Sequence, residues 1–400
     1  MRTVALGDVA DFIRGVTFKP ADVADTPRPS DVRCLRTKNV QDELDIDDVW
    51  AIDSSFVRRP EQFLQAGDVI ISTANSWNLV GKCSWVPELP WRATFGGFVT
   101  TLRPRPKVVD PRYLYRWMSW GHTQANLRSF GQRTTSISNM NLDRCRKMSI
   151  PLPPIEEQRR IAAILDAADE LRAKRRAALA HLDSLTQSIF LNLFGDLDST
   201  PRRWPSVRLD EIVFDSRIGL VRGSADLGPG LPYPYLRMNA ITRQGELQFG
   251  DLRCTAASSN EVERYSLKEG DLLFNTRNSR ELVGKTALYR RNETCLFNNN
   301  LMRIRFRRDL ADPEFVAAAL RTPTLIREIE SRKSGTTNVF AVYFKDLRSL
   351  PVPLPPISLQ RTFAQRVSVV RAVASTFQES ASQMDSMLAS LQQRAFSGAL

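Results

Sequence analysis

Residues 151–194 decide the fold and read PLPPIEEQRRIAAILDAADELRAKRRAALAHLDSLTQSIFLNLF. The prolines fix the backbone angle φ and lack N–H donors, and no Gly or Pro follows between residues 155 and 194, so a long helix is predicted to begin here. Apolar or small side chains recur at intervals of three and four, with Arg175 as the one charged interruption, at Ile161, Ile164, Ala168, Leu171, Ala178, Leu182, Leu185 and Ile189. This spacing is typical of a coiled-coil seam, which requires a partner helix.

The partner is predicted at the other end of the chain. Residues 353–363, PLPPISLQRTF, repeat residues 151–161 at an offset of 202, and a second stretch without internal Pro or Gly follows as far as Gly398. Its seam is predicted at Phe363, Val367, Val370, Ala374, Phe377, Ala381, Met384, Leu388, Leu391 and Ala395. We expect the two helices to pair antiparallel, with two ordinary bundle helices as the alternative.

The two helices are also expected to differ in length. The interval from Gln158 to Phe190 is 32 residues, whereas the interval from Gln360 to Phe396 is 36 residues. We therefore expect the second helix to be four residues longer, close to one turn.

The regions that precede the helices resemble each other too. GDVIISTANSWNLVGK at 67–82 aligns with GDLLFNTRNSRELVGK at 270–285 at an offset of 203. Each region alternates short predicted strands with polar turns, and one or two helices are predicted at 111–130 and at 312–332. Residues 194–209 have the composition of a linker. The chain is therefore a tandem repeat of mixed α/β globules and long helices, and the fold class is α+β with pseudo-twofold symmetry.

Charge is concentrated in the globular regions. The chain carries a net charge of +12, of which residues 1–150 contribute +5 and residues 201–352 contribute +7. The helical regions 155–200 and 353–400 contribute only −2 and +2. A basic surface suits a polyanion, so the two globules are the candidate nucleic-acid surfaces and the helices are a scaffold.

Other signals limit the possible functions. The N-terminus has no signal-peptide core and no apolar run is long enough to span a membrane, so we expect a cytoplasmic protein with no membrane contact. The five cysteines form no CxxC pair, which favours reduced thiols over a zinc site. The VGKT sequence at 283–286 is not a phosphate-binding loop, because Ser279 stands where that motif requires Gly. No methyltransferase or nuclease motif is found, which suggests a recognition subunit whose partners perform the chemistry.

The repeated motifs resemble those of type I restriction-modification specificity (S) subunits, over the whole chain. The stretches that carry the resemblance are PLPPIEEQRRIAAILD at 151–166, LTQSIFLNLFGD at 185–196, PLPPISLQR at 353–361 and SLQQRAFSGAL at 390–400. The resemblance implies target recognition domains at 1–150 and 199–352, and coiled-coil spacers at 151–198 and 353–400. It also implies that this chain is not an enzyme, and that it recognises a split double-stranded DNA sequence.

The partners and cofactors follow from the same resemblance. Two modification (M) subunits would methylate adenine N6 from S-adenosylmethionine, and restriction (R) subunits would use ATP and Mg²⁺, so no cofactor is expected on this chain. In the second copy SLQ at 358–360 replaces EEQ, which could make the two M-binding surfaces unequal. The candidate partner-binding residues are Gln158, Arg159, Gln360 and Arg361.

Candidate DNA contacts fall in three groups. Basic side chains would bind phosphates, polar clusters would pair with bases, and Gly/Thr-rich loops would position the backbone. In the first region these residues are Lys38, Asn75, Ser76, Trp77, Asn78, Lys82, Arg133, Thr134 and Thr135. In the second region they are Arg277, Asn278, Ser279, Arg280, Lys285, Arg332, Lys333, Thr336 and Thr337. A plain polar turn remains the alternative for each cluster.

Two other functions stay open at this point. The chain could be a stand-alone DNA-binding or adaptor protein that self-associates through its coiled coil, or a nuclease with an unfamiliar site.

Overall fold

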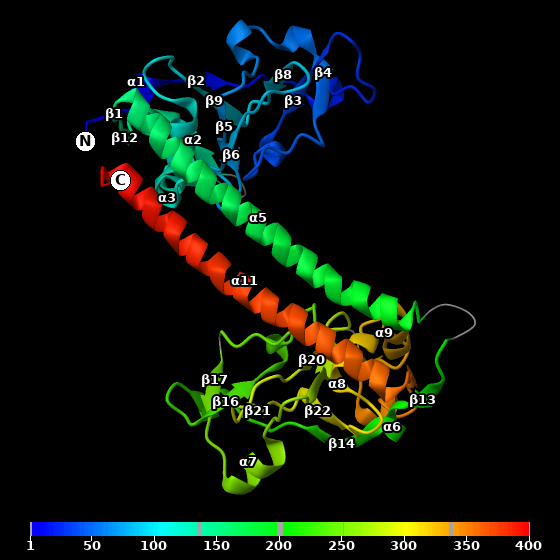
Figure 1. The fold of residues 1–400 in the computed structure, drawn as a ribbon. Helices are drawn as coiled ribbons and strands as arrows, with labels where there is room; N and C mark the ends of the chain where they lie inside the picture. Colours follow the sequence, from blue (N-terminus) through cyan, green and yellow to red (C-terminus); the bar gives the residue numbers. More distant parts are fainter. Residues whose placement is uncertain (1, 134–137, 198–202, 251, 336–338, 400) are drawn as a thin grey trace. The chain divides into compact units, whose positions relative to one another are not determined.

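The computed structural model describes residues 2–133, 138–197, 203–250, 252–335 and 339–399 (Figure 1). The chain forms two compact units: unit 1 comprises Met1–Arg176 and Glu379–Leu400, and unit 2 comprises Ala177–Gln378. Each long helix is therefore shared, because its first half belongs to one unit and its second half to the other.

Unit 1 is built on small antiparallel sheets. A four-stranded sheet has the order β2-β9-β5-β7, two three-stranded sheets have the orders β4-β3-β8 and β10-β11-β6, and β1 pairs with β12. Only the β3–β8 pair in these sheets is parallel. The strands are β1 (Thr3–Ala5), β2 (Ala10–Arg14), β3 (Asp31–Leu35), β4 (Trp50–Asp53), β5 (Val69–Ser72), β6 (Ala74–Asn75), β7 (Cys83–Trp85), β8 (Ala93–Phe95), β9 (Val99–Pro104), β10 (Gly131–Arg133), β11 (Ser138–Met140) and β12 (Ser149–Pro151). The α-helices are α1 (Leu6–Val9), α2 (Pro111–Ser119), α3 (Gly121–Ser129), α4 (Leu142–Arg146) and α5 (Ile155–Phe194), which continues into unit 2.

Unit 2 repeats this order of elements. Its sheets are β14-β22-β18-β20, β15-β17-β16-β21, β19-β24-β23 and β13-β25. The strands are β13 (Ser206–Arg208), β14 (Val213–Ile218), β15 (Leu227–Gly228), β16 (Tyr233–Leu236), β17 (Arg253–Thr255), β18 (Leu272–Asn275), β19 (Arg277–Asn278), β20 (Thr286–Leu288), β21 (Leu296–Phe297), β22 (Leu301–Phe306), β23 (Ser334–Gly335), β24 (Phe340–Ala341) and β25 (Pro351–Pro353). The α-helices are α6 (Leu209–Ile212), α7 (Ser259–Tyr265), α8 (Pro313–Ala319), α9 (Pro323–Glu330), α10 (Phe344–Leu347) and α11 (Ile357–Ser397), which continues into unit 1.

The structure confirms the tandem repeat. Strand β15 and helix α7 are the described additions in unit 2, and the two helices predicted before each long helix are present as α2–α3 and α8–α9. A pair of glycines shows how closely the copies agree. A Cβ atom on Gly15 would lie 2.2 Å from the Gly96 carbonyl oxygen, and one on Gly219 would lie 2.3 Å from the Phe297 carbonyl oxygen. Only Gly fits where the chain leaves β2 or β14 and passes this close to another backbone segment.

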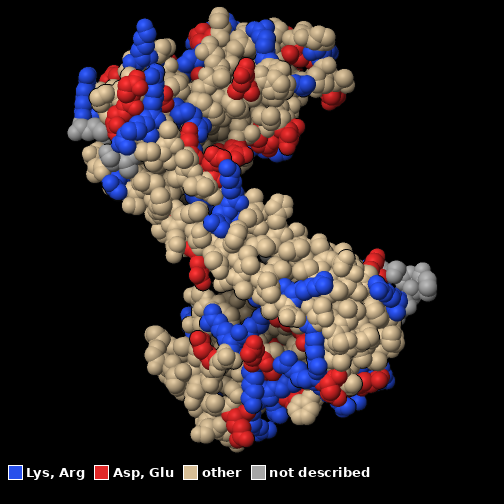
Figure 2. Space-filling view, viewed as in Figure 1, with Lys and Arg blue, Asp and Glu red and all other residues tan. Residues whose placement is uncertain are grey.

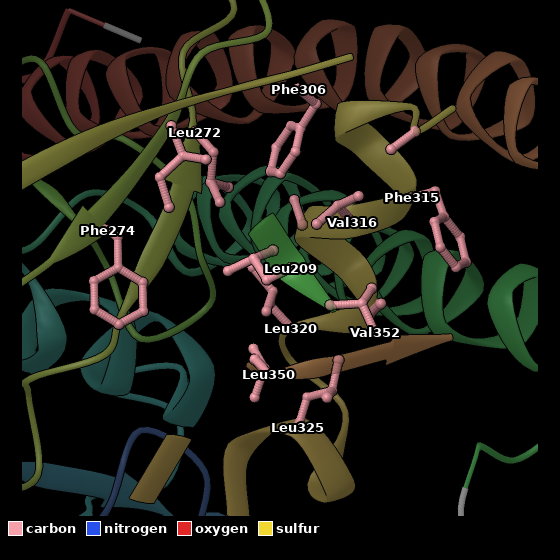
Figure 3. Packing of buried hydrophobic residues seen from close by; sticks show 14 of the residues in the cluster. Leu209, Leu272, Phe274, Phe306, Phe315, Val316, Leu320, Leu325, Leu350 and Val352 are labelled. Atoms are coloured by element: carbon pink, nitrogen blue, oxygen red, sulfur yellow. The ribbon is translucent and has the colours of Figure 1, made fainter. Parts of the chain in front are cut away.

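The largest core of unit 2 lies between its first sheet, helices α8 and α9, and the two long helices. Figure 3 shows Leu209, Leu272, Phe306, Val316 and other labelled side chains of this cluster converging from strands and helices. The ends of the long helices are part of it, because Phe194 of α5 lies 4.7 Å from Phe315, and 5.6 Å from Phe363 of α11, between ring centroids. The C-terminal end of α5 is thus held in the core of unit 2.

Unit 1 uses the other ends of the same helices. Phe396 near the end of α11 lies 5.7 Å from Tyr113 and 5.2 Å from Trp120 between ring centroids. Ile161 and Leu165 near the start of α5 are buried in the same cluster. Each unit therefore contains the beginning of one long helix and the end of the other, which is the predicted antiparallel pairing (Figure 1).

The seam of α11 is confirmed at all ten predicted positions, which are buried or half-buried. The predicted seam of α5 is wrong in part, since Leu171 and Leu185 are 54% and 42% exposed. A second three-four pattern is buried or half-buried throughout, at Ile161, Leu165, Ala168, Arg172, Arg175, Leu179, Leu182, Thr186, Ile189 and Leu193. Where two apolar residues are adjacent, as at Ile164 and Leu165, either one fits a three-four spacing. This pattern includes the half-buried Arg172 and Arg175, whose long side chains can keep their charged ends near solvent.

Two other expectations are corrected. The helices α5 and α11 have 40 and 41 residues and begin 202 residues apart, so the predicted four-residue difference is not found. The residue that corresponds to Phe396 is Phe194, also 202 residues earlier, rather than Phe190. The predicted linker is also shorter than 194–209, because Ser206–Arg208 forms β13. Among the described residues, no helix is long and apolar enough to cross a membrane.

Candidate nucleic-acid interface

Two predicted clusters that are distant in sequence meet in one small sheet of unit 1. Asn75 of β6 is opposite Ser138 of β11, and Ser138 is opposite Arg133 of β10. The Asn75–Asn78 cluster and the start of the Thr-rich loop are therefore joined in one sheet, on the two strands that flank β11. We call the sheet β10-β11-β6 the candidate sheet of unit 1. Thr134 and Thr135 lie outside the described residues.

The same arrangement recurs in unit 2. Arg277 of β19 and Ser334 of β23 are both paired with Ala341 of β24. The sheet β19-β24-β23 is accordingly the candidate sheet of unit 2, and it again joins a polar cluster to a Gly/Thr-rich loop. Thr336 and Thr337 lie outside the described residues.

Asparagine shapes the turn that leaves each candidate sheet. The Asn75 Oδ1 atom accepts a hydrogen bond from the Ser76 backbone N–H at 2.8 Å, and Asn278 Oδ1 accepts one from Ser279 N–H at 2.9 Å. Asn75 also donates to the Ser72 Oγ atom at 3.1 Å. These two asparagines are partly used in holding the turns. The exposed side chains of the clusters are Ser76, Asn78, Arg277, Ser279 and Arg280.

Trp77 is half-buried and covers part of the candidate sheet. A Cβ atom on Gly131 would lie 3.3 Å from Trp77 Cζ3, so Gly131 lets the indole ring lie directly on β10. The predicted contact of Trp77 with DNA stays a prediction.

The basic residues differ in how available they are. Lys333 is only 9% exposed in its side chain, and its Nζ atom lies 2.6 Å from Glu330 Oε2 and donates to the Arg280 carbonyl oxygen at 2.6 Å. Arg280 bonds the other Glu330 oxygen, and hydrogen bonds from Lys333 and Arg280 lower the pKa of Glu330. Arg332 is paired with Glu328 at 2.6 Å. Lys333 thus holds the end of α9 against the turn, whereas Arg332 bonds within the end of α9 itself.

Lys82 and Lys285, the lysines of the repeated motif, bind to loops of their own units. Lys82 Nζ donates to Gln41 Oε1 at 2.8 Å and lies 3.4 Å from Asp42. Lys285 donates to the Ile241 carbonyl oxygen, and burial is the main cause that lowers the pKa of Lys285. Both lysines therefore reach the loop after the strand β3 or β16.

The side chains of Lys38 and Arg277 are exposed to solvent. Lys38 is exposed and pairs with Asp48, an ion pair that water and DNA phosphates can exchange easily. The side chain of Arg277 is exposed and makes no hydrogen bond or ion pair within the described part of the chain. For Arg133 the structure gives the backbone position in β10.

The predicted partner-binding glutamines are buried. Gln158 Oε1 accepts from the Asp110 backbone N–H at 2.8 Å, and its Nε2 donates to the Pro153 carbonyl oxygen at 2.8 Å. Gln360 repeats both bonds with Asp312 and Pro355, at 2.9 and 2.7 Å. Each amide thus ties the start of a long helix to the start of α2 or α8. This explains why both copies of the motif contain Gln, and it leaves Arg159 and Arg361, which are exposed, as the accessible members of that prediction.

Sequence reasoning missed the residues that hold the candidate sheets. Thr73 donates from Oγ to the Phe98 carbonyl oxygen at 3.1 Å, and Thr276 donates to the Asn300 carbonyl oxygen at 3.0 Å. The signal was present, because Thr is one of the residues shared by the repeated segments 67–82 and 270–285.

The charged surface is mixed. On the face shown in Figure 2, Lys and Arg side chains of unit 2 alternate with Asp and Glu. In the described part of the chain, no three His, Cys, Asp or Glu side chains come close enough to hold a metal ion. The arrangement therefore offers exposed hydrogen-bonding groups and scattered cations on two equivalent sheets.

Comparison with known proteins assigns these units. The family model described as "Type I restriction modification DNA specificity domain" matches residues 1–181 and again residues 201–381. The chain belongs to this family. It is a DNA specificity subunit of the type I restriction-modification class, with one specificity domain in each repeat.

Relatives cover almost the whole specificity subunit. The EcoKI specificity subunit of Escherichia coli K12 is 25% identical over 98% of this chain and 87% of its own length. The StySPI specificity subunit of Salmonella potsdam is 24% identical over 100% of this chain and 89% of its own length.

Solved structures share the fold. The S subunit from M. genitalium has a TM-score of 0.62 at 14% identity and covers 99% of this chain and 96% of its own. A chain from a study of complex assembly and conformational transition in the type I system has a TM-score of 0.56 at 20% identity and covers 100% and 98%. Both confirm the predicted architecture of repeated α/β domains and long helices.

Proposed function

We propose that each unit of this specificity subunit reads one half of a split double-stranded DNA target, and that the chain itself performs no catalysis. The observation that carries the proposal is the duplicated candidate sheet, which has the same backbone in both units but different exposed side chains. Ser76 and Ser279 are the same residue, but Asn78 of unit 1 is replaced by Glu281 in unit 2, and Trp77 is replaced by Arg280. A shared frame with different polar groups suits two half-sites of different sequence.

We also propose that the paired long helices dock two modification subunits. Counting heptads from the observed seams, Leu171 and Leu185 of α5 and Val373 and Met387 of α11 occupy the same flanking position. All four are between 40% and 59% exposed, although apolar side chains of this size are usually covered.

These four residues form two equivalent pairs. The ion pair between Arg172 Nε and Asp385 Oδ1, 2.5 Å apart, places Leu171 and Met387 at the same level of the helix pair in unit 1. Leu185 and Val373 are the pair related to them by the 202-residue repeat, in unit 2. Two equal apolar patches fit two copies of one partner.

The chemistry then belongs to the partners. M subunits would transfer a methyl group from S-adenosylmethionine to adenine N6, and R subunits would use ATP and Mg²⁺ for cleavage. We place the complex in the cytoplasm, where its DNA target is.

Domain exchange tests the DNA part of the proposal. Residues 201–350 are replaced by the equivalent region of a relative, the chain is produced with its M subunits, and methylated adenines are mapped in the host genome. We expect one half of the methylated sequence to change and the other half to persist. A change in both halves would refute the assignment of one half-site to each unit.

The mass of the complex with its M subunits tests the two docking patches. Leu171→Lys with Met387→Lys should lower the light-scattering mass of the complex by one M subunit, and adding Leu185→Lys with Val373→Lys should remove the second. Leu191→Lys is the control, because Leu191 is 46% exposed but lies off this flank. A self-associating adaptor would instead give a mass that does not depend on the M subunit.

A further inference from the structure

One turn beside each candidate sheet carries very different side chains in the two units. The turn Gly96–Val99 joins β8 to β9 and is closed by a hydrogen bond from Val99 N–H to the Gly96 carbonyl oxygen at 2.9 Å. The corresponding turn Asn298–Leu301 joins β21 to β22 and is closed by the same bond, also at 2.9 Å. Phe98 occupies the third position in unit 1, and Asn300 occupies it in unit 2.

Both turns are fixed to the candidate sheet by threonine. The Phe98 carbonyl oxygen accepts the Thr73 backbone N–H at 2.9 Å and the Thr73 hydroxyl at 3.1 Å. The Asn300 carbonyl oxygen accepts the same two groups of Thr276, at 2.9 and 3.0 Å.

The threonines also hold the sheet itself. The Thr73 carbonyl oxygen accepts the Met140 N–H at 2.8 Å, and the Thr276 carbonyl oxygen accepts the Val342 N–H at 2.9 Å. Residues 98 and 300 are therefore held at a defined place beside the candidate sheets. The threonines that bind them stand two residues before Asn75 and Asn278.

The side chains of Phe98 and Asn300 make few contacts within their own units. Phe98 is 62% exposed, which leaves most of its ring in contact with water. The Asn300 side chain is half-buried, and its one described contact is a weak one from Nδ2 to the Met238 sulfur at 3.7 Å. An exposed aromatic ring and an uncommitted amide are two ways of contacting a base. The ring makes apolar contact with a thymine methyl group or a base step, and the amide pairs with adenine.

We propose that positions 98 and 300 are equivalent specificity-determining positions. Phe98 makes an apolar contact with a base of the half-site read by unit 1, and Asn300 hydrogen-bonds to a base of the half-site read by unit 2. The inference rests on the proposed function, and it explains why the turn backbone is duplicated while the side chain is not. It also gives a role to the FGGF segment at 95–98, in which the small residues before Phe98 leave its ring accessible.

Single substitutions test the proposal in the complete complex with the M subunits. Phe98→Ala should weaken binding to the target duplex about tenfold, as expected for an aromatic ring that no longer becomes buried. In genomic methylation maps it should relax one position of the first half-site only. Phe98→Leu retains an apolar side chain and should keep most of the preference. Asn300→Ala should relax one position of the second half-site only.

The control is Phe214→Ala, which removes another exposed phenylalanine, 75% exposed, from strand β14. It should leave both half-sites unchanged. The proposal is overturned if Phe98→Ala leaves the methylated sequence unchanged, relaxes the other half-site, or acts by releasing an M subunit. A wild-type complex that methylates no split sequence would instead refute the proposed function itself.

Discussion

Glu314 is a charged link between α8 and the long helix α11. It accepts hydrogen bonds from Arg290 at 2.6 and 2.9 Å and from Arg371 of α11 at 2.9 and 3.2 Å. Burial alone would raise the pKa of Glu314, but these guanidinium groups outweigh it and lower the pKa from 4.5 to about 2. The carboxylate therefore stabilises unit 2 only while it is ionised.

The size and the pH range follow from that pKa. A shift of this size corresponds to about 3 kcal/mol of stability for the ionised group. Because the folded pKa lies below the unfolded value, this stability is complete above about pH 5 and is lost as the pH falls through 4.5 toward 2. At pH 3.5 the wild-type chain should already have lost about 1.4 kcal/mol of it.

Glu314→Gln removes the charge and keeps the shape. We expect the variant to be less stable than wild type by about 3 kcal/mol at pH 7, because two arginines then lose their counter-ion. Urea unfolding between pH 7 and pH 3.5 measures the difference, and hydrogen exchange of α8 and α11 peptides assigns it to unit 2. The difference should shrink by about 1.4 kcal/mol over this range.

A matched control is Glu293→Gln. Its side chain is 71% exposed and lies 3.6 Å from Arg291, so its loss should cost less than about 1 kcal/mol. A stability difference for Glu314→Gln that stays constant from pH 7 to pH 3.5 would show that the carboxylate charge does not hold α8 to α11.

Three further predictions concern single side chains. Gln360→Leu should lower the free energy of unfolding by about 2–3 kcal/mol in chemical denaturation, because buried backbone groups lose their hydrogen-bond partners. Gln158→Leu should have the same effect in unit 1, and a variant as stable as wild type would contradict this reasoning. Arg172→Met should change stability by less than about 1 kcal/mol in the same assay, since its ion pairs are partly exposed, and a large loss would show that the seam depends on this charge. Arg277→Ala should reduce the salt dependence of DNA binding by about one unit in log–log slope, and an unchanged slope would exclude a phosphate contact.

The repeat itself was predictable because the two copies share identical residues at a constant offset. The proline starts, the seam of α11 and the helices before each long helix follow from local rules that need no tertiary information. The phase of α5 did not follow, because Ile164 and Leu165 are both apolar, so periodicity fits either one. The choice depends on contacts with α11 and with α2, which are distant in sequence.

The candidate site was predicted as separate pieces. No local pattern in the sequence indicates that Asn75 and Arg133 lie in one sheet, because β6 and β10 are joined only through β11. The roles of Lys333 and Gln158 were missed for a related reason. A Lys or Gln in a motif is equally compatible with an exposed contact and with a buried hydrogen bond, and only burial separates the two.

The repeat also carries a reversal of charge that sequence alignment alone does not explain. Arg112 of α2 bonds Asp166 of α5 at 2.9 and 2.6 Å in unit 1. Glu314 of α8 stands 202 residues after Arg112 and bonds Arg371 of α11, which stands 202 residues after the acidic Asp169 of α5. The globule is therefore basic and the helix acidic at this contact in unit 1, and the opposite holds in unit 2. If α5 began on the wrong globule, like charges would meet, so the reversal favours the correct partner for each helix start.

Equal helix length leads to the final prediction. Each helix is anchored at both ends, α5 by Ile161 in unit 1 and Phe194 in unit 2, and α11 by Phe363 in unit 2 and Phe396 in unit 1. Removing residues from one helix alone would pull an aromatic anchor out of a core, at a cost of about 3–5 kcal/mol.

Removing one heptad from both helices, 175–181 and 377–383, keeps both seams in phase and all four anchors in place. Each helix loses about 10.5 Å, which corresponds to about three base pairs of duplex. We expect the paired deletion to fold and to methylate the same two half-sites with a spacer shorter by up to three base pairs. The single deletion of 175–181 should be insoluble or inactive. Methylation mapping that shows the original spacer at full activity for the paired deletion would refute the argument that helix length sets the spacing.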